Sequence, residues 1–401
     1  MRLPLLPALI IIIVGALVDW YIIFRAKKGD FSDKRIPYAR PIYIIVSAVV
    51  SIAMLVVAVA PKKTVSEGQL YALMWTIFAY FSIYVPKYII AVFSLLRQLF
   101  SWIFHRRLRI ITLFGASFGA VLFILLWWGA LVTRNSIDVR RVEVPVADLP
   151  AAFNGYRIVQ ISDIHTGTFG SNPRFLEKMV SRINELHPDI ILFTGDIVNR
   201  HSSELAPFMP VLSGLKAPDG VWSVMGNHDY GEYYSWPSVK DRLDDVIALK
   251  SMQHEMGWTM LNNSHSVIRH GADSIVLIGV ENIGDPPFTT YGNLAVAYPR
   301  LSDNSKKILL SHNPAHWVDS IANKKDVNID LTLAGHTHAM QIRLFGKSPA
   351  ALRYKTWGGL YTDSIGRSLY VNTGIGEVGF PSRIGATPEI TLITLTEKAK
   401  R

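Results

Sequence analysis

The fold of this chain is decided by the stretch Val221-Trp222-Ser223-Val224-Met225-Gly226-Asn227-His228-Asp229-Tyr230. Its apolar half ends at a glycine, which is typical of a buried strand followed by a sharp turn. Asn227, His228 and Asp229 then stand at the carboxyl end of the predicted strand, where open α/β sheets bind their ligands. Because polar turns after strands are common, this stretch alone does not distinguish a cation site from an ordinary turn.

Four other predicted strands also end in side chains that bind metals. These are Asp163-x-His165, Gly195-Asp196, Ser311-His312 and His336-x-His338. In an extended segment residues i and i+2 point to the same side, so each x-spaced pair is expected to face one cation. Oxygen and imidazole ligands suit ions such as Mn, Fe, Zn or Mg. Each motif alone has an ordinary alternative, such as a capping turn or a buried histidine, but their occurrence at five strand ends favours a metal site.

From about Val142 onward, apolar strand-like segments alternate with helical segments. The predicted strands cover residues 156–161, 189–193, 221–225, 274–279, 307–310, 329–333, 368–372 and 389–395, and the predicted helices cover 173–186, 203–213 and 238–256. This alternation is typical of a layered α/β domain.

The first third of the chain carries its apolar excess. The protein has 401 residues, 50% of them hydrophobic, and a mean hydropathy of +0.24. Four apolar runs, over residues 3–24, 42–60, 70–96 and 110–132, have the roughly 20 residues that cross a bilayer. We therefore predict a transmembrane helical region over residues 1–134 and a second domain over residues 135–401. Lys87, in the third run, must extend to the membrane surface or face other helices.

The charged residues and the lack of cysteine narrow the possible partners. A formal net charge of +10 suits an anionic partner, and the absence of cysteine excludes disulfides and thiolate metal sites. Basic residues gather in segments 25–40 and 97–109, whereas segment 61–68 has only Lys62 and Lys63. Since short basic loops stay in the cytoplasm, we expect the second domain to lie outside the cytoplasm.

The order and spacing of these motifs resemble the calcineurin-like metallophosphoesterases over residues 144–395. The resemblance is strongest to the membrane-attached bacterial branch, through Leu310-Ser311-His312-Asn313-Pro314 and Asn372-Thr373-Gly374-Ile375-Gly376. It implies a four-layer αββα sandwich around two mixed sheets. It also implies a site with two divalent metal ions (Mn, Fe or Zn) that are bridged by an aspartate and by a water or hydroxide.

The resemblance further assigns roles to individual residues. One metal would be held by Asp163, His165, Asp196 and His338, and the other by Asp196, Asn227, His312 and His336. The bridging hydroxide would attack phosphorus, and His228 would contact a phosphate oxygen and act as general acid. Asp229 would either orient His228 or bind the backbone of its own turn. Ala339-Met340 stand where related bacterial enzymes usually have two glycines. These positions approach the site, so the substrate is expected to fit differently, although no metal ligand is lost.

The expected function is therefore that of a membrane-anchored hydrolase acting on a phosphodiester, phosphomonoester or pyrophosphate bond, with phosphodiesters favoured. Its anchor favours a lipid-linked substrate. The alternatives are a nuclease or nucleotide phosphodiesterase, and a non-catalytic receptor for phosphate ligands. The sequence has no basic stretch interleaved with aromatic residues of the kind that binds single strands, which disfavours nucleic acid as the substrate. Arg343, Lys355 and Arg383 are weaker candidates for binding a second anionic group.

Overall fold

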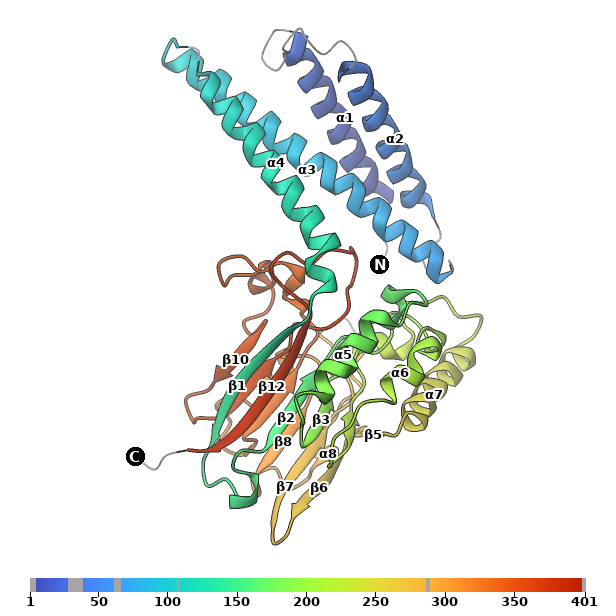
Figure 1. Cartoon of the computed structure of the whole chain (residues 1–401), viewed down its shortest axis with the longest axis vertical. Coiled ribbons are helices and arrows are strands. Elements are labelled where there is room, and N and C mark those ends of the chain that lie inside the picture. The colour runs from blue at the N-terminus through green and yellow to red at the C-terminus, as the bar shows by residue number, and fades with distance from the viewer. Residues whose placement is uncertain (1–4, 28–38, 61–65, 107, 286–288, 399–401) are drawn as a thin grey trace. The chain divides into compact units, whose positions relative to one another are not determined.

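The computed structural model describes residues 5–27, 39–60, 66–106, 108–285 and 289–398 (Figure 1). The chain forms two compact units. One contains Met1–Val132 together with Gly379–Ser382, and the other contains Thr133–Val378 together with Arg383–Arg401. We call them the helical unit and the sheet unit.

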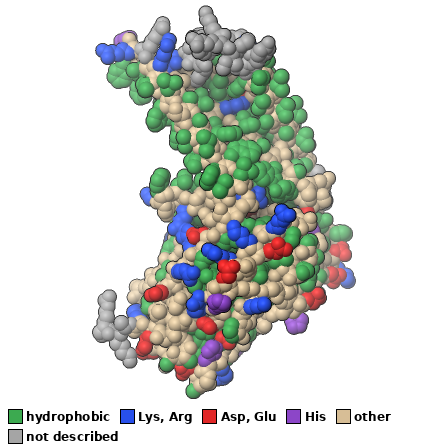
Figure 2. All heavy atoms as spheres, in the orientation of Figure 1, with side chains coloured by type: hydrophobic (Ala, Val, Ile, Leu, Met, Phe, Trp, Pro, Cys, Tyr) green, Lys and Arg blue, Asp and Glu red, His purple; other side chains and the backbone are tan. Residues whose placement is uncertain are grey.

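The helical unit contains four long apolar helices, as predicted. They are α1 (Leu5–Lys27), α2 (Ala39–Val59), α3 (Glu67–Ile103) and α4 (Arg109–Leu131). Each is long and apolar enough to cross a membrane. Figure 2 shows their surface covered by hydrophobic side chains, whereas charged side chains are spread over the sheet unit. Such a surface suits contact with lipid and not with water.

A polar cluster joins three of these helices, and Lys87 lies in it. The Lys87 ammonium lies 2.8 Å from the Asp19 carboxylate and 2.6 Å from the Ser47 hydroxyl. Tyr43 and Tyr84 donate their hydroxyls to the same carboxylate at 2.5 and 2.7 Å. Both tyrosine rings also lie 4.4 Å from the ammonium. Lys87 thus faces other helices, which was one of the two alternatives for it.

The sheet unit contains two mixed six-stranded sheets. The first has the order β1 (Asp138–Val146), β12 (Glu389–Glu397), β2 (Arg157–Ile161), β3 (Ile190–Phe193), β4 (Val221–Ser223), β5 (Trp258–Met260). The second has the order β10 (Gly359–Thr362), β11 (Ser368–Val371), β9 (Leu331–Ala334), β8 (Lys307–Leu310), β7 (Asp273–Gly279), β6 (Ser264–His270). Strands β2 to β5 run parallel in the first sheet, and β7, β8, β9 and β11 run parallel in the second.

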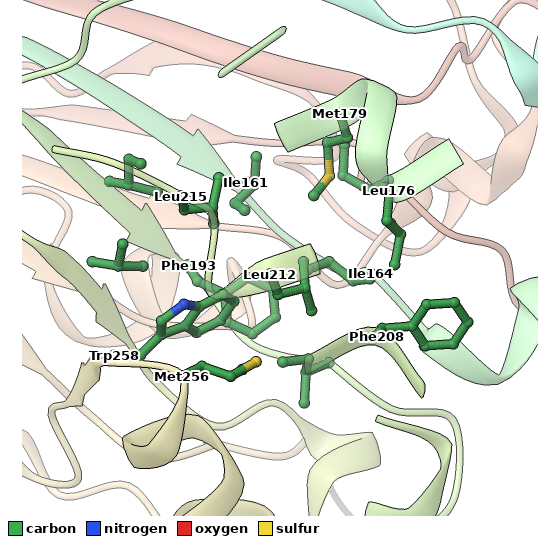
Figure 3. Close-up of a cluster of buried hydrophobic side chains, with 14 of the residues drawn as sticks. Ile161, Ile164, Leu176, Met179, Phe193, Phe208, Leu212, Leu215, Met256 and Trp258 are labelled. Carbon is green, nitrogen blue, oxygen red and sulfur yellow. The ribbon is translucent and has the colours of Figure 1, made fainter. Parts of the chain in front are cut away.

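Three hydrophobic clusters separate four layers. Alternate residues of one strand enter different clusters, because side chains alternate across a sheet: Ile158 packs between the two sheets, whereas Val159 faces the helices outside the first sheet. Those helices are α5 (Arg174–Asn184), α6 (Met209–Leu212) and α7 (Val239–Glu255). Figure 3 shows side chains of this layer gathered around Phe193 and Trp258.

The fourth layer covers the second sheet. It contains the short helices α8 (Leu294–Ala297) and α9 (Ala315–Ser320), whose Ala297 and Trp317 pack on Ile278 and Leu309. The four-layer αββα sandwich behind an apolar helical region, predicted from the resemblance, is confirmed.

Some details differ from the predictions. The helix predicted over residues 203–213 is two 3₁₀ turns followed by the short α6, because Pro207 and Pro210 remove backbone donors. Strands β1, β5, β6 and β10 were not predicted. Of the residues on which the orientation prediction rests, Lys28, Lys34, Arg35, Lys62, Lys63 and Arg107 lie outside the described residues.

Candidate metal centre

Five strands from the two sheets end at one site. Asp163 follows β2, Asp196 follows β3, Asn227 follows β4, His312 follows β8, and His336 and His338 follow β9. The carboxyl ends of parallel strands bring these loops to one edge of the sandwich. Asp163, His165, Asp196 and His312 are almost completely buried there.

The first cluster consists of Asp163, His165 and His338. The two imidazole Nε2 atoms lie 3.1 Å apart, and the His338 Nε2 lies 3.2 Å from the Asp163 carboxylate. Ligands that share one cation at roughly 2.1 Å lie roughly 3 Å from each other. The third separation, from the His165 Nε2 to the Asp163 carboxylate, is 3.9 Å, so the three donor atoms lie close enough together to share one cation.

The second cluster consists of Asp196, His312 and His336. The His312 Nε2 lies 3.2 Å from Asp196 Oδ2, 3.3 Å from His336 Nδ1 and 3.1 Å from the amide oxygen of Asn227. Asn227 therefore supplies a fourth possible ligand atom.

Asp196 links the two clusters. The same Oδ2 atom that approaches His312 also lies 3.6 Å from the His165 Nε2 of the first cluster. One carboxylate that faces two groups of ligands is the arrangement in which an anion offsets the repulsion between two neighbouring cations.

The backbone is strained where it carries these residues. Asp163, His165, Asp196, His336 and His338 all have positive φ angles, between 48° and 72°. Side chains disfavour this region, and such strain persists mainly at functional sites. The turn from His338 to Gln341 continues with positive φ at four successive residues.

Two glycines make room for the carboxylates. A Cβ atom on Gly226 would lie 2.2 Å from Asp196 Oδ1, and one on Gly335 would lie 2.3 Å from Asp163 Oδ2. Both separations are far shorter than a van der Waals contact, so neither position accepts a side chain without movement of the site.

Asp229 binds backbone and holds two strand ends together. Its carboxylate accepts N–H bonds from Gly226 in its own turn, and from Asp196, Ile197 and Val198 in the neighbouring loop. No described bond joins it to His228. These contacts favour the second alternative for Asp229, that of binding its own turn, and extend it to the loop of Asp196.

His228 lies beside both clusters without joining either. Its Nδ1 donates to the Asn199 carbonyl oxygen at 2.7 Å, so Nε2 is the nitrogen left for a substrate. Its ring stacks on Tyr233 at a centroid distance of 4.0 Å and meets the His165 ring edge-on at 4.8 Å. Its backbone N–H donates to Asp196 Oδ1 at 2.8 Å. The imidazole is thus held next to Asp196 in a fixed orientation.

Outer partners orient the imidazole rings. His312 donates Nδ1–H to the Thr194 carbonyl at 2.8 Å, and the His336 Nε2 lies 3.0 Å from the Tyr354 hydroxyl. The Arg383 guanidinium lies 3.3 Å from the His338 Nδ1. The carbonyl and hydroxyl contacts fix the ring and the tautomer of His312 and His336, as in metal sites, whereas the guanidinium can only donate to His338.

The protonation of the site follows from its burial. Burial lowers the pKa of His165 and His228, and it lowers the pKa of His336 to about 3, so these rings are neutral. Burial would also lower the pKa of His312, but the adjacent Asp196 carboxylate raises it to about 9. Burial and the charge of Asp196 raise the pKa of Asp229 to about 7. A metal cation binds the neutral imidazole, so His312 would release its proton when it binds one.

The structure corrects two of the expectations. The spacing of His336 and His338 does not place them in one cluster: their backbone is left-handed and not extended, and they lie in different clusters, which is the division that the resemblance implies. Arg383 is not a surface anion site: it is fully buried and donates to the carbonyl oxygens of Thr373, Gly376 and Ala386. The contacts of Tyr233 and Tyr354 with the site were not foreseen, and no local motif in the sequence marks them.

Comparison with known proteins identifies the family. The sequence model of the calcineurin-like phosphoesterases matches residues 156–340, which contain all of the candidate residues. A second model, described as the transmembrane domain of a probable calcineurin-like phosphoesterase, matches residues 1–134.

Three relatives illustrate the range of similar proteins. A Danio rerio transmembrane protein with metallophosphoesterase domain is 32% identical over 68% of this chain and 61% of its own length. The uncharacterized Bacillus subtilis metallophosphoesterase YkuE is 32% identical over 62% of this chain and 81% of its own length. The Chlamydia trachomatis UDP-2,3-diacylglucosamine pyrophosphatase LpxG is 27% identical over 67% of this chain and 93% of its own length. The chain thus spans less than two thirds of the Danio rerio protein.

Proposed function

The chain belongs to the calcineurin-like metallophosphoesterase family, and from this premise we propose that it is a membrane-anchored phosphoesterase that binds two divalent cations. One observation carries the proposal: Asp196 Oδ2 faces an imidazole of each cluster, at 3.6 and 3.2 Å. A carboxylate shared between imidazoles of both clusters fits a pair of cations better than it fits a single ion.

The ligands divide into two sets. Asp163, His165, Asp196 and His338 would hold one cation, and Asp196, Asn227, His312 and His336 would hold the other. The donor set of carboxylate, imidazole and amide oxygen suits Mn, Fe or Zn. When bound, such ions supply Lewis acidity toward phosphoryl oxygens and lower the pKa of water.

The chain's own residues then position the substrate and protonate the leaving group. His228 is held by Asn199 and Tyr233 with Nε2 available, so it would donate to a phosphate oxygen and protonate the leaving group. Because the pKa of His228 is lowered by burial, it needs the charge of the bound phosphate to hold that proton. Asp229 would keep the loops of Asp196 and Asn227 in register through its backbone bonds.

We propose a lipid-linked substrate and an extracytoplasmic site. The four apolar helices keep the protein in a bilayer, and the relative LpxG is named for a lipid-bearing substrate, a diacylated nucleotide sugar. The basic segments 25–40 and 97–109 favour a cytoplasmic location for the helix ends they join. A site outside the cytoplasm would disfavour cytoplasmic nucleotide-linked precursors, so orientation and substrate are linked predictions.

A hydrolysis assay on the full-length chain tests the activity. The protein would be purified in detergent, stripped of metal and refilled with Mn, and then assayed on bis-p-nitrophenyl phosphate and p-nitrophenyl phosphate. Cleavage of the diester that is lost in Asp196→Asn supports a phosphodiesterase. Cleavage of the monoester alone would point to a phosphatase.

The control variant is Asp330→Asn. Asp330 precedes β9 at the strand end opposite His336 and accepts the Lys307 backbone N–H at 2.8 Å. It should retain turnover. Absence of turnover on either compound, with metal present in the site, would contradict the proposed hydrolysis and favour a receptor for phosphate ligands.

A further inference from the structure

A loop beside the metal centre exposes large apolar side chains. Phe345 is fully exposed and Leu352 is 93% exposed, which makes them the two most exposed large apolar residues described in the sheet unit. Leu344, on the same loop, and Met340, shortly before it, are also exposed. We call residues 342–356 the apolar loop. A soluble surface rarely carries so many apolar side chains within one short segment, and such a group marks a contact site.

The backbone of the apolar loop forms a tight turn with Phe345 at its tip. Leu344 and Lys347 exchange backbone hydrogen bonds of 2.9 and 3.0 Å, which closes a two-residue turn with Phe345 and Gly346 at its tip. Both tip residues have positive φ, 51° and 75°. Asn or Gly usually occupies such positions, whereas a bulky aromatic residue there is an outlier. The backbone of Phe345 is therefore strained, although its ring makes no buried contact with the described residues that would offset the strain.

The charges of the apolar loop are all of one sign. Residues 342–356 contain Arg343, Lys347, Arg353 and Lys355 and no acidic residue. Lys347, Arg353 and Lys355 are exposed, and Arg353 also pairs with Asp285 at 2.9 Å. Apolar tips surrounded by cations are the arrangement by which segments insert into the headgroup layer of an anionic membrane.

The apolar loop is tied directly to the metal centre. Tyr354 lies within it and bonds His336 at 3.0 Å, and Ser348 donates to the Ala339 carbonyl, one residue after His338. Arg343 donates its backbone N–H to Ile384 at 2.7 Å, next to the buried Arg383. The residues on both sides of the loop tip are therefore attached to the ligand-bearing turn His336–His338 or to the segment of Arg383.

We propose that the apolar loop is a lipid-contact element, which inserts Phe345 and Leu352 into an anionic bilayer surface while its Lys and Arg side chains bind lipid phosphates. This contact would bring lipid-borne phosphoesters to the metal centre. The insertion itself does not depend on the proposed hydrolysis, although the delivery of substrate does. The occupant is a lipid surface because the cations match anionic headgroups and because the same chain carries four membrane-length helices.

Site-specific labelling tests the insertion directly. The chain has no cysteine, so a single Phe345→Cys or Leu352→Cys change provides a unique site for an environment-sensitive fluorophore. The full-length variants would be reconstituted in vesicles of phosphatidylcholine, with or without phosphatidylglycerol. Val296→Cys, on α8 and 65% exposed, is the matched control.

We expect the labels at 345 and 352 to shift to the blue and to be quenched by lipids with a spin label in the acyl chain. Both effects should be stronger with phosphatidylglycerol, and the label at 296 should show neither. Labels at 345 and 352 that remain as water-exposed as the label at 296, in both lipid mixtures, would overturn the proposal.

An activity comparison separates this surface from the site. Phe345→Asp should retain cleavage of soluble bis-p-nitrophenyl phosphate, and it should cut a phosphoester embedded in the vesicles about tenfold more slowly or worse, because a buried aromatic ring is lost. Equal loss on both substrates would indicate damage to the metal centre and would contradict a separate lipid-contact role. If the wild type cuts neither substrate, the proposed hydrolysis fails, while the fluorescence result still decides the insertion.

Discussion

Two regions of this protein bury charged side chains, and they do so in different ways. In the helical unit, the Asp19 carboxylate meets an ammonium and two hydroxyl donors, so the charges satisfy one another. In the metal centre, the imidazole nitrogens of His165 and His338 face each other at 3.1 Å, and the buried His165 Nδ1 has no hydrogen-bond partner among the described residues. The polar cluster of the helical unit is complete without a ligand, and the metal centre is not.

The backbone shows the same difference. The residues of the helical cluster lie in regular helices, whereas five candidate ligands of the metal centre adopt positive φ. A complete cluster in regular structure serves to hold helices together. Converging donors on a strained backbone serve to bind something else, since strain persists where function requires it.

The largest expected effect is on turnover at the metal centre. His228→Ala removes the proposed general acid but none of the proposed ligands, so turnover should fall about 10²–10⁴-fold. Metal content, measured by elemental analysis, should not change. His265→Ala is the matched control, because that imidazole binds the Ala297 carbonyl. A His228→Ala enzyme that retains full turnover would remove His228 from the chemistry.

Mutations in the polar cluster of the helical unit should change the stability of the protein and not its catalytic activity. Lys87→Met leaves the Asp19 carboxylate without its cation among the helices, which should cost about 3–5 kcal/mol. Thermal unfolding of the full chain in detergent would measure this loss. The double change Asp19→Leu with Lys87→Met should recover much of the stability. A single variant as stable as the wild type would show that the ion pair does not hold the helices.

Asp229 should affect metal affinity because it holds the loops that carry the candidate ligands. Asp229→Asn keeps the shape but loses an anionic acceptor for backbone N–H groups of two loops, so metal affinity should fall about 10–100-fold. Metal titration followed by calorimetry would measure the change. Unchanged affinity would mean that the loops keep their places without this carboxylate.

Glu377 offers the smallest and most pH-dependent test, because it is buried and has an ion-pair partner but no hydrogen bond among the described residues. Burial raises its pKa from 4.5 to about 7, although Arg134, 3.2 Å away, lowers it. Its carboxyl is therefore protonated below about pH 4.5 in both the folded and the unfolded state, and stability is lost as pH rises from there toward 7.

Glu377→Gln should accordingly raise the free energy of unfolding at pH 8 by at least about 1 kcal/mol, since the raised pKa is the burial cost that remains after the attraction to Arg134. The gain should shrink as the pH falls toward 4.5. Melting temperatures at pH 8 and pH 5 would show it. A variant that is destabilised at pH 8 would mean that the ion pair with Arg134 outweighs the cost of burial.

Local patterns predicted most of the fold and of the candidate site. The run Ile190–Phe193 is wholly apolar, and Lys307–Leu310 has three apolar residues after its lysine, so both are predicted as buried strands, and the polar residues after them mark the site. Strand β1 was missed because Asp138–Val146 mixes charged residues with Pro145 and is half-exposed at a sheet edge. Its pairing with β12, far along the chain, determines its structure.

The rest of the site depends on long-range contacts. Spacing alone suggested that His336 and His338 share one cation, but the left-handed backbone directs them to different clusters. The bond of Tyr354 to His336 and the burial of Arg383 beside His338 arise from how the loops fold back. No periodicity in the sequence contains this information.

The most direct test of the central claim is the metal content of the full-length chain. After metal removal and refilling with Mn, elemental analysis should find about two ions per chain, because each cluster provides a complete ligand set around the shared Asp196. Asp196→Asn should hold clearly fewer than two ions, and His265→Ala should still hold two. A wild-type chain that retains one ion or none would contradict a two-cation centre.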